Sequence, residues 1–98
     1  MTFNVKNYFD EMVRAVSSQD RNAHHTVKNN TCSIFANAAF QEMPADALII
    51  SYDGDILSAV LENNMTPLIE TCITSKTDTK SISNFNRKIG KMVGFKFN

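Results

Sequence analysis

Apolar residues near the start of the chain recur at the spacing of one helical face. The repeat i, i+3, i+4, i+7, i+8, i+11 is carried by Val5, Tyr8, Phe9, Met12, Val13 and Val16. Thr2 or Asn4 can cap the first turn. The pattern predicts a helix over residues 4–17, whose apolar stripe we interpret as core or, alternatively, as the face of a homodimer.

The next stretch interrupts this pattern. Residues 17–30 carry Val27 as their one large aliphatic side chain, which predicts a long loop or a poorly packed turn of helix. A second helix is predicted over residues 31–43, beginning at Thr31 and ending before Pro44, because the residue before proline avoids the helical region. The apolar side of this helix would contain Ile34, Phe35, Ala38, Ala39 and Met43.

The middle of the chain combines a clear strand with two ambiguous segments. The apolar run 45–52 predicts a buried strand. Asp53-Gly54 could turn the chain straight back as a hairpin, but the helical spacing of the aliphatic residues after it favours a helix over 55–63. Residues 66–75 stay open between a helix that begins at Pro67 and a β-branched strand that completes a βαβ unit with 47–52.

The C-terminal segment has the strongest functional character. Ile82, Phe85 and Ile89 predict the apolar face of a helix over residues 81–93, with Gly94 as its C-cap. Phe95-Lys96-Phe97 then alternates like a short strand. The polar side has no carboxylate, and we expect it to bind a nucleic acid or a partner. The candidate residues are Lys80, Ser83, Asn84, Arg87, Lys88, Lys91 and Lys96.

Together these elements predict one domain over residues 1–98. We expect an α+β but mainly α fold, with about four helices and a short β component. The helices at 4–17 and 31–43 would form its N-terminal part, and residues 55–98 a helix-turn-helix-like C-terminal half.

The zero net charge conceals an asymmetry along the chain. Residues 1–75 contain four basic and nine acidic side chains, a balance of −5, whereas residues 76–98 contain six basic side chains and one acidic, a balance of +5. A cationic surface that survives folding would attract phosphate or carboxylate groups. The alternative is that the two parts neutralise each other across the folded molecule.

The composition indicates where the protein works. No apolar run is long enough for a membrane span, and the first residues do not have the form of a secretory signal, so we expect a cytoplasmic protein. Cys32 and Cys72 are most simply buried, reduced thiols, although one disulfide between them stays open.

Two groups of residues invite a catalytic or metal-binding interpretation. Tyr52-Asp53-Gly54-Asp55 is similar to the acidic pair of topoisomerase-primase domains, which implies Mg²⁺, but that family's upstream glutamate motif has no counterpart here. We therefore interpret Asp53 as a turn residue and Asp55 as a helix N-cap. His24 and His25 are adjacent and point in different directions. No nucleophile motif or phosphate loop is present, so we expect no enzyme, no cofactor and no metal.

The C-terminal half resembles a winged helix. The resemblance covers residues 55–98, with helices expected at 55–63 and 67–75 before the basic helix, and with the final Phe95–Asn98 segment in the place of a wing. It departs from that family because the inter-helix turn lacks a glycine and no second wing strand follows. The resemblance implies a DNA-binding regulator that uses the basic helix.

A second function class competes with this one. The short, asparagine-rich chain without a catalytic set has the profile of a phage-encoded inhibitor of a host defence complex, similar to anti-CRISPR proteins. Such an inhibitor would act by protein–protein binding on a nucleic-acid-binding complex. Salt dependence would separate the two classes, because nucleic-acid binding releases counterions and weakens steeply with salt.

Overall fold

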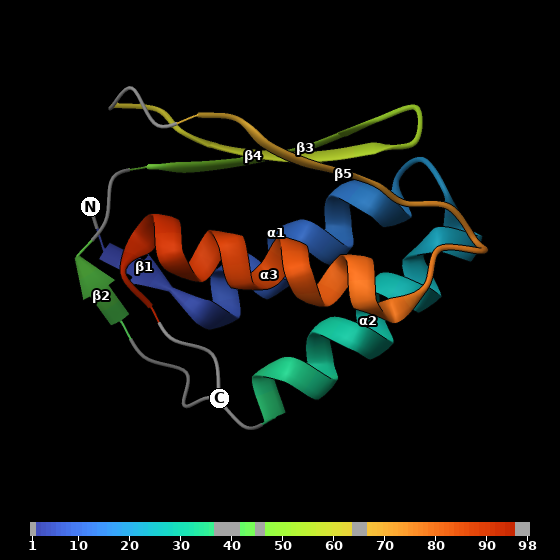
Figure 1. Ribbon diagram of the computed structural model, residues 1–98, viewed down its shortest axis with the longest axis horizontal. Coiled ribbons are helices and arrows are strands. Elements are labelled where there is room, and N and C mark those ends of the chain that lie inside the picture. Colours follow the sequence, from blue (N-terminus) through green and yellow to red (C-terminus); the bar gives the residue numbers. More distant parts are fainter. Residues whose placement is uncertain (1, 37–41, 45–46, 64–66, 96–98) are drawn as a thin grey trace.

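The computed structural model describes residues 2–36, 42–44, 47–63 and 67–95. Three helices and five strands lie within these ranges (Figure 1). The helices are α1 (Val5–Ser17), α2 (Arg21–Ala36) and α3 (Thr79–Val93). The strands are β1 (Thr2–Asn4), β2 (Glu42–Pro44), β3 (Leu48–Asp53), β4 (Ile56–Leu61) and β5 (Ile69–Cys72).

The elements form layers. Strands β3, β4 and β5 make an antiparallel sheet in which each strand pairs with the next along the chain. Helix α1 packs against β3 and helix α3 against β5, while α2 packs against both of these helices. Figure 1 shows the sheet above α1 and α3, with α2 below them. Strands β1 and β2 pair separately, in antiparallel fashion.

The first and last helices confirm the prediction from periodicity. Helix α1 is capped by Asn4, whose Oδ1 accepts the backbone N–H of Asn7 at 3.0 Å. Helix α3 begins after Asp78, whose Oδ1 accepts the N–H of Ser81 at 2.9 Å, and it ends at Gly94 in the left-handed region with φ 77°. Phe95 is buried outside any strand, and residues 96 and 97, the rest of the predicted short strand, lie outside the described residues.

The loop predicted over residues 17–30 is wrong. Most of it belongs to α2, which starts after Asp20, where the Asp20 Oδ1 accepts the N–H groups of Asn22 and Ala23. Thr31, predicted as a helix start, lies within α2 and is fully buried. The helix ends at Ala36, residues 37–41 of the predicted helix lie outside the described residues, and residues 42–44 form β2.

The helix predicted over residues 55–63 is also wrong. That segment forms β4, which returns antiparallel to β3 through the hairpin that Asp53-Gly54 had offered as the alternative. Pairing of Asp53 with Ile56 leaves Gly54 and Asp55 as a two-residue loop, so Asp55 caps no helix. Gly54 has φ 61°, the positive value that a type II′ hairpin requires at this position.

Residues 69–72 settle as a strand, the alternative suggested by their β-branched side chains, but they pair antiparallel with β4, so no βαβ unit forms. Neither segment expected to precede the basic helix in a helix-turn-helix is helical. The prediction of an α+β, mainly α fold with about four helices, a short β component and a helix-turn-helix-like C-terminal half is therefore wrong. In the described residues, three helices pack with a three-stranded antiparallel sheet.

One apolar core joins the helices to the sheet. The inner face of the sheet supplies Tyr52, Leu57, Ala59 and Leu61. The apolar stripe of α1, including Val5 and Met12, is buried within this core.

A small polar network crosses the helical part of the core. The Tyr8 hydroxyl donates to Asn86 Oδ1 at 2.6 Å, and Asn86 Nδ2 donates to Thr31 Oγ1 at 3.4 Å. Tyr8, Thr31 and Asn86 therefore link α1, α2 and α3 through hydrogen bonds away from water. Burial raises the pKa of the Tyr8 hydroxyl well above its ordinary value.

The two cysteines differ from their prediction as buried thiols. Cys32 on α2 and Cys72 on β5 are free, and both are exposed. Their exposure follows from position, because Cys32 lies one residue after the buried Thr31 and Cys72 points to the outer side of an alternating strand.

Candidate binding surface on helix α3

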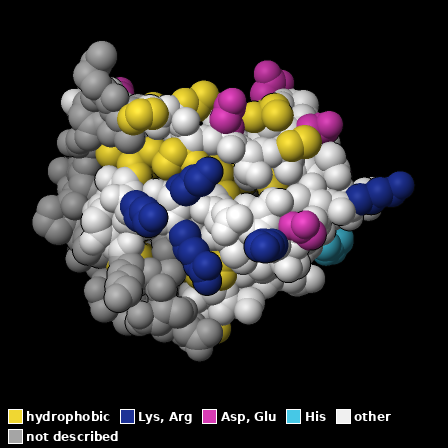
Figure 2. All heavy atoms as spheres, viewed as in Figure 1, with side chains coloured by type: hydrophobic (Ala, Val, Ile, Leu, Met, Phe, Trp, Pro, Cys, Tyr) yellow, Lys and Arg dark blue, Asp and Glu magenta, His cyan; other side chains and the backbone are white. Residues whose placement is uncertain are grey.

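The predicted candidate residues on α3 lie mainly on one exposed strip. Lys80, Asn84, Arg87, Lys88 and Lys91 are all exposed and recur at helical spacing. The opposite side of the helix is buried through residues such as Phe85 and Ile89. We call the five exposed residues the basic strip. Figure 2 shows lysine and arginine side chains gathered over α3 on the face in view.

Within the described residues, no cation of the basic strip forms an ion pair with a carboxylate, although Lys80 lies near enough to Asp78 to influence its charge. Among the described residues, the single ion pair joins Lys6 Nζ and Asp10 Oδ2 on α1, at 3.3 Å. The described residues therefore form no direct ion pair between the acidic part of the chain, residues 1–75, and the basic part, residues 76–98. The strip keeps its positive charge available to an external anion.

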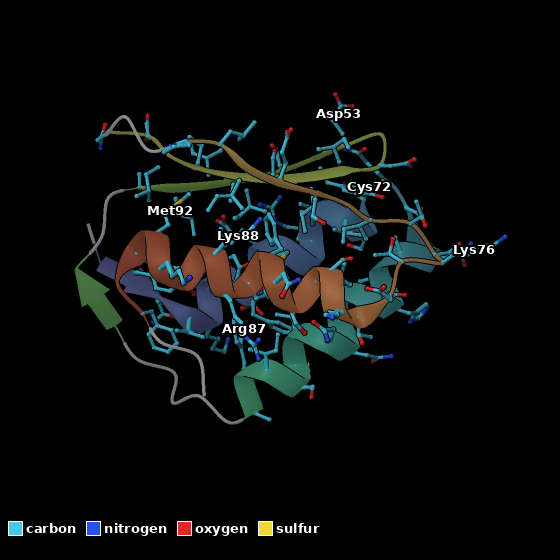
Figure 3. All side chains as sticks on the ribbon, in the orientation of Figure 1. Asp53, Cys72, Lys76, Arg87, Lys88 and Met92 are labelled. Carbon is cyan, nitrogen blue, oxygen red and sulfur yellow. The ribbon has the colours of Figure 1, made fainter. Side chains whose placement is uncertain are left out.

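Arg87 and Lys88 point away from each other on either side of the strip (Figure 3). Lys88 lies on the side toward the sheet and Arg87 on the side toward α2. A flat array of anionic groups could meet both, because their heads are separated across the width of the helix. The planar guanidinium of Arg87 can donate two parallel hydrogen bonds to one phosphate, which an ammonium cannot.

Two of the predicted site residues, Ser83 and Lys96, do not belong to the basic strip. Ser83 is half-buried, and its hydroxyl donates to Asn30 Oδ1 on α2 at 3.2 Å. Its hydroxyl is thus engaged between the helices, and Ser83 positions α3 instead of facing outward with the strip. Lys96 lies outside the described residues.

Helix α2 adds a polar border that the sequence reasoning missed, because residues 17–30 were assigned to a loop. The Asn30–Ser83 hydrogen bond marks the side of α2 that faces α3. Asn22, Thr26, Asn29 and Ser33 recur at helical spacing beside Asn30. These amides and hydroxyls can hydrogen-bond to phosphate or sugar oxygens without adding repulsive charge.

The two cations of α2 lie elsewhere on that helix. Lys28 stands seven residues before Phe35, which places both on the same side of the helix. The ring of Phe35 packs against Phe9 of α1, so Lys28 lies nearer α1 than α3.

The adjacent histidines of α2 lie close together. Partial burial, followed by the charges of His25, Lys28 and Arg21, lowers the pKa of His24. The His24 and His25 ring centroids lie 5.4 Å apart.

The acidic pair lies at the end of β3 and in the turn that follows it. Asp53 and Asp55 are exposed at the hairpin that joins β3 to β4. Within the described ranges, no group of three or more histidine, cysteine, aspartate or glutamate side chains could hold a metal ion.

None of the helices in the described part of the chain is long and apolar enough to cross a membrane. Comparison of the chain with protein-family models, with curated proteins and with solved structures gave no match. These comparisons leave the resemblance to winged-helix domains and the phage-type hypothesis untested.

Proposed function

We propose that the protein is a small non-catalytic binding protein that contacts the phosphate backbone of a nucleic acid through the basic strip of α3. The observation that carries this proposal is the exposure of four cations on one side of α3, none of which forms an ion pair among the described residues. Lysine and arginine that neutralise phosphates release condensed counterions, which favours binding at low salt.

The arrangement suits backbone contacts better than base reading. Helix α3 is flanked by β5 on one side and by α2 on the other. The basic strip is therefore the outward side of a packed helix, and α3 does not project from the protein. Phosphate contacts need charge and hydrogen-bond donors but no insertion into a groove. The polar border of α2 would extend such contacts beside the strip, and binding with little sequence preference follows.

The proposal is tested with the double substitution Arg87→Glu, Lys91→Glu. Fluorescence anisotropy would follow binding to a labelled DNA duplex and to a labelled single strand across a salt series. We expect wild-type affinity to fall with salt, and the double variant to bind far more weakly than the wild type at low salt. Each phosphate contact contributes about 0.9 to the slope of log K against log salt for duplex DNA, so the residual slope should be shallower by roughly two.

A matched control separates local recognition from total charge. Lys6→Glu, Arg14→Glu makes the same change in net charge on α1, where both side chains are exposed. This control should retain most of the wild-type affinity. Equal losses in the two double variants would show that net charge alone attracts the nucleic acid, and no binding by the wild type at low salt would overturn the proposal.

A protein inhibitor that contacts a host nucleic-acid-binding complex is the competing proposal. Such a protein could present the same cations to carboxylates of the complex. A pull-down from lysate with and without nuclease, using wild type and the Arg87→Glu, Lys91→Glu variant, distinguishes the two. Capture that survives nuclease but requires Arg87 and Lys91 would favour the inhibitor.

A further inference from the structure

The sheet has one face that no described element covers. The three helices lie on the other face (Figure 1). Side chains alternate along β3 and β4, so Ile49 and Ile56 point outward while Tyr52 and Leu57 point into the core. The large hydrophobic residues that stand most exposed in the described structure are Ile49 at 46%, Ile56 at 41% and Leu68 at 54%.

Strand register brings the apolar side chains of this outer face into a row. Ile49 of β3 lies directly opposite Val60 of β4. Ala59 of β4 lies opposite Ile69 of β5. Because these strands are antiparallel, the residue after Ala59, which is Val60, comes next to the residue before Ile69, which is Leu68. Side chains that are neighbours on one face of paired strands stand about 5 Å apart. Ile49, Val60 and Leu68 therefore form one apolar row across the sheet. Beside it, the Ser51 and Ser58 hydroxyls hydrogen-bond to each other at 2.8 Å.

The charged side chains of the segment that contains the three sheet strands, residues 48–72, all have one sign. Asp53, Asp55, Glu62 and Glu70 are exposed on or beside the sheet strands. No lysine or arginine occurs in the sequence between Lys28 and Lys76. Two copies of the chain meeting face to face would bring these carboxylates together, which disfavours self-association, and an anionic lipid surface would be repelled for the same reason.

We propose that the uncovered sheet face is a docking surface for a protein segment that presents aliphatic side chains bordered by lysine or arginine. The aliphatic side chains pack on Ile49, Val60 and Leu68 and remove them from water. The cations of the partner meet the carboxylates at the border, which steers association and fixes orientation. This surface is separate from the basic strip of α3 and takes a partner of the opposite charge.

The test uses two synthetic helical peptides of about 18 residues, or five turns. Both present the same leucine face, one bordered by lysine and the other by glutamate. Anisotropy of the labelled peptides should show binding of the lysine peptide to the wild type and none of the glutamate peptide. The double variant Ile49→Ser, Leu68→Ser should bind the lysine peptide about tenfold more weakly, a loss of about 1.4 kcal/mol.

Two further variants keep the result interpretable. Asp53→Lys, Glu70→Lys should weaken the lysine peptide and admit the glutamate peptide, because it changes border charge while leaving the apolar row intact. Arg87→Glu, Lys91→Glu should not weaken the lysine peptide, so failure here is distinct from failure of the nucleic-acid proposal. Thermal melting of each variant checks that the exposed substitutions leave the fold intact.

Three outcomes would overturn the inference. The wild type would fail to bind the lysine peptide, or the Ile49→Ser, Leu68→Ser variant would bind it as tightly as the wild type. Alternatively, sedimentation would show a dimer that dissociates in that variant, which would assign the face to a second copy of the chain.

Discussion

The pair of helices α2 and α3 and the sheet β3–β5 supply opposite sides of one core but differ in their outer surfaces. The two helices carry six lysine or arginine residues and no carboxylate. The segment 48–72, which contains the three sheet strands, carries four carboxylates and no lysine or arginine. The sheet also exposes large aliphatic side chains, whereas the outer surface of α3 is polar.

The difference teaches that the zero net charge of the whole chain conceals two regions of opposite charge, helices α2 and α3 on one side and the sheet on the other. The division found in the sequence, acidic before residue 76 and basic after it, places α2 on the acidic side. Folding instead moves α2 next to α3, and the boundary between the charges runs between the helices and the sheet. Each surface can therefore attract a partner that the other repels.

The largest expected effect tests whether the two regions are one cooperative unit. Phe85 of α3 and Leu57 of β4 are both essentially fully buried, at 1% and 0% exposure. Phe85→Ala should lower the free energy of unfolding by about 3–5 kcal/mol, and Leu57→Ala by about 2–5 kcal/mol. Urea unfolding followed by circular dichroism measures both.

The control for this pair is Ile56→Ala, one residue from Leu57 but on the exposed side of the strand. It should change stability far less. A separate early transition in Leu57→Ala, with helical signal retained, would mean that the sheet unfolds independently of the helices and that the shared core does not couple them.

A second prediction concerns the polar network that links the three helices. Asn86→Ala removes the acceptor of the Tyr8 hydroxyl and the donor to Thr31, leaving buried polar groups without these partners. We expect a loss of about 1–3 kcal/mol. Tyr8→Phe combined with Asn86→Ala should cost less than the sum of the single changes, and a double-mutant cycle measures the difference. Strictly additive losses would show that the two side chains do not interact energetically.

The smallest expected effect is a pH dependence confined to the start of α3. The pKa of Asp78 is lowered because its carboxylate accepts hydrogen bonds from the Ser81 backbone N–H and then from the Ser81 hydroxyl. The folded state therefore favours the charged form. Its contribution is complete above the pKa of the unfolded chain and is lost as pH falls through the lower folded value.

Melting temperature measured against pH checks this contribution. Asp78→Asn retains a capping acceptor but does not titrate, so its melting temperature should fall less steeply in acid than that of the wild type. Asp78→Ala should be less stable than the wild type at neutral pH, where the intact cap is fully formed. Identical acid profiles for wild type and Asp78→Asn would contradict the role given to this carboxylate.

The sequence predicted the elements whose local signals agree with one another. Helices α1 and α3 combine a long apolar repeat with a capping side chain, and Gly94 marks the end of α3. These local signals are enough to define each helix without information from residues that are distant in the sequence. The same repeat predicts that Lys80, Asn84, Arg87, Lys88 and Lys91 lie on the exposed side of α3, as they do in the structure.

Helix α2 and strand β4 were not predicted because their patterns of apolar residues are weak or ambiguous. The buried side of α2 consists of Ala23, Val27, Thr31 and Phe35, of which an alanine and a threonine do not register as a strong apolar stripe. In β4, Ile56, Leu57, Val60 and Leu61 fit a helical repeat as well as a strand. The residues buried there are Leu57, Ala59 and Leu61, at a period of two. Because α2 was not predicted, the polar border beside the basic strip was not predicted either. Because β4 was predicted as a helix, the uncovered face of the sheet could not be predicted.

The order of elements along the chain affects how the protein folds as it leaves the ribosome. Strands β3–β5 pair with their immediate neighbours in sequence, so the sheet can form early from local contacts. Helix α3 follows all of these strands, yet its Asn86 accepts from Tyr8, 78 residues earlier. Until α3 has been synthesised, the inner face of the sheet and the stripe of α1 lack an essential neighbour. A nascent chain that ends before Asp78 therefore leaves part of this apolar surface exposed to water.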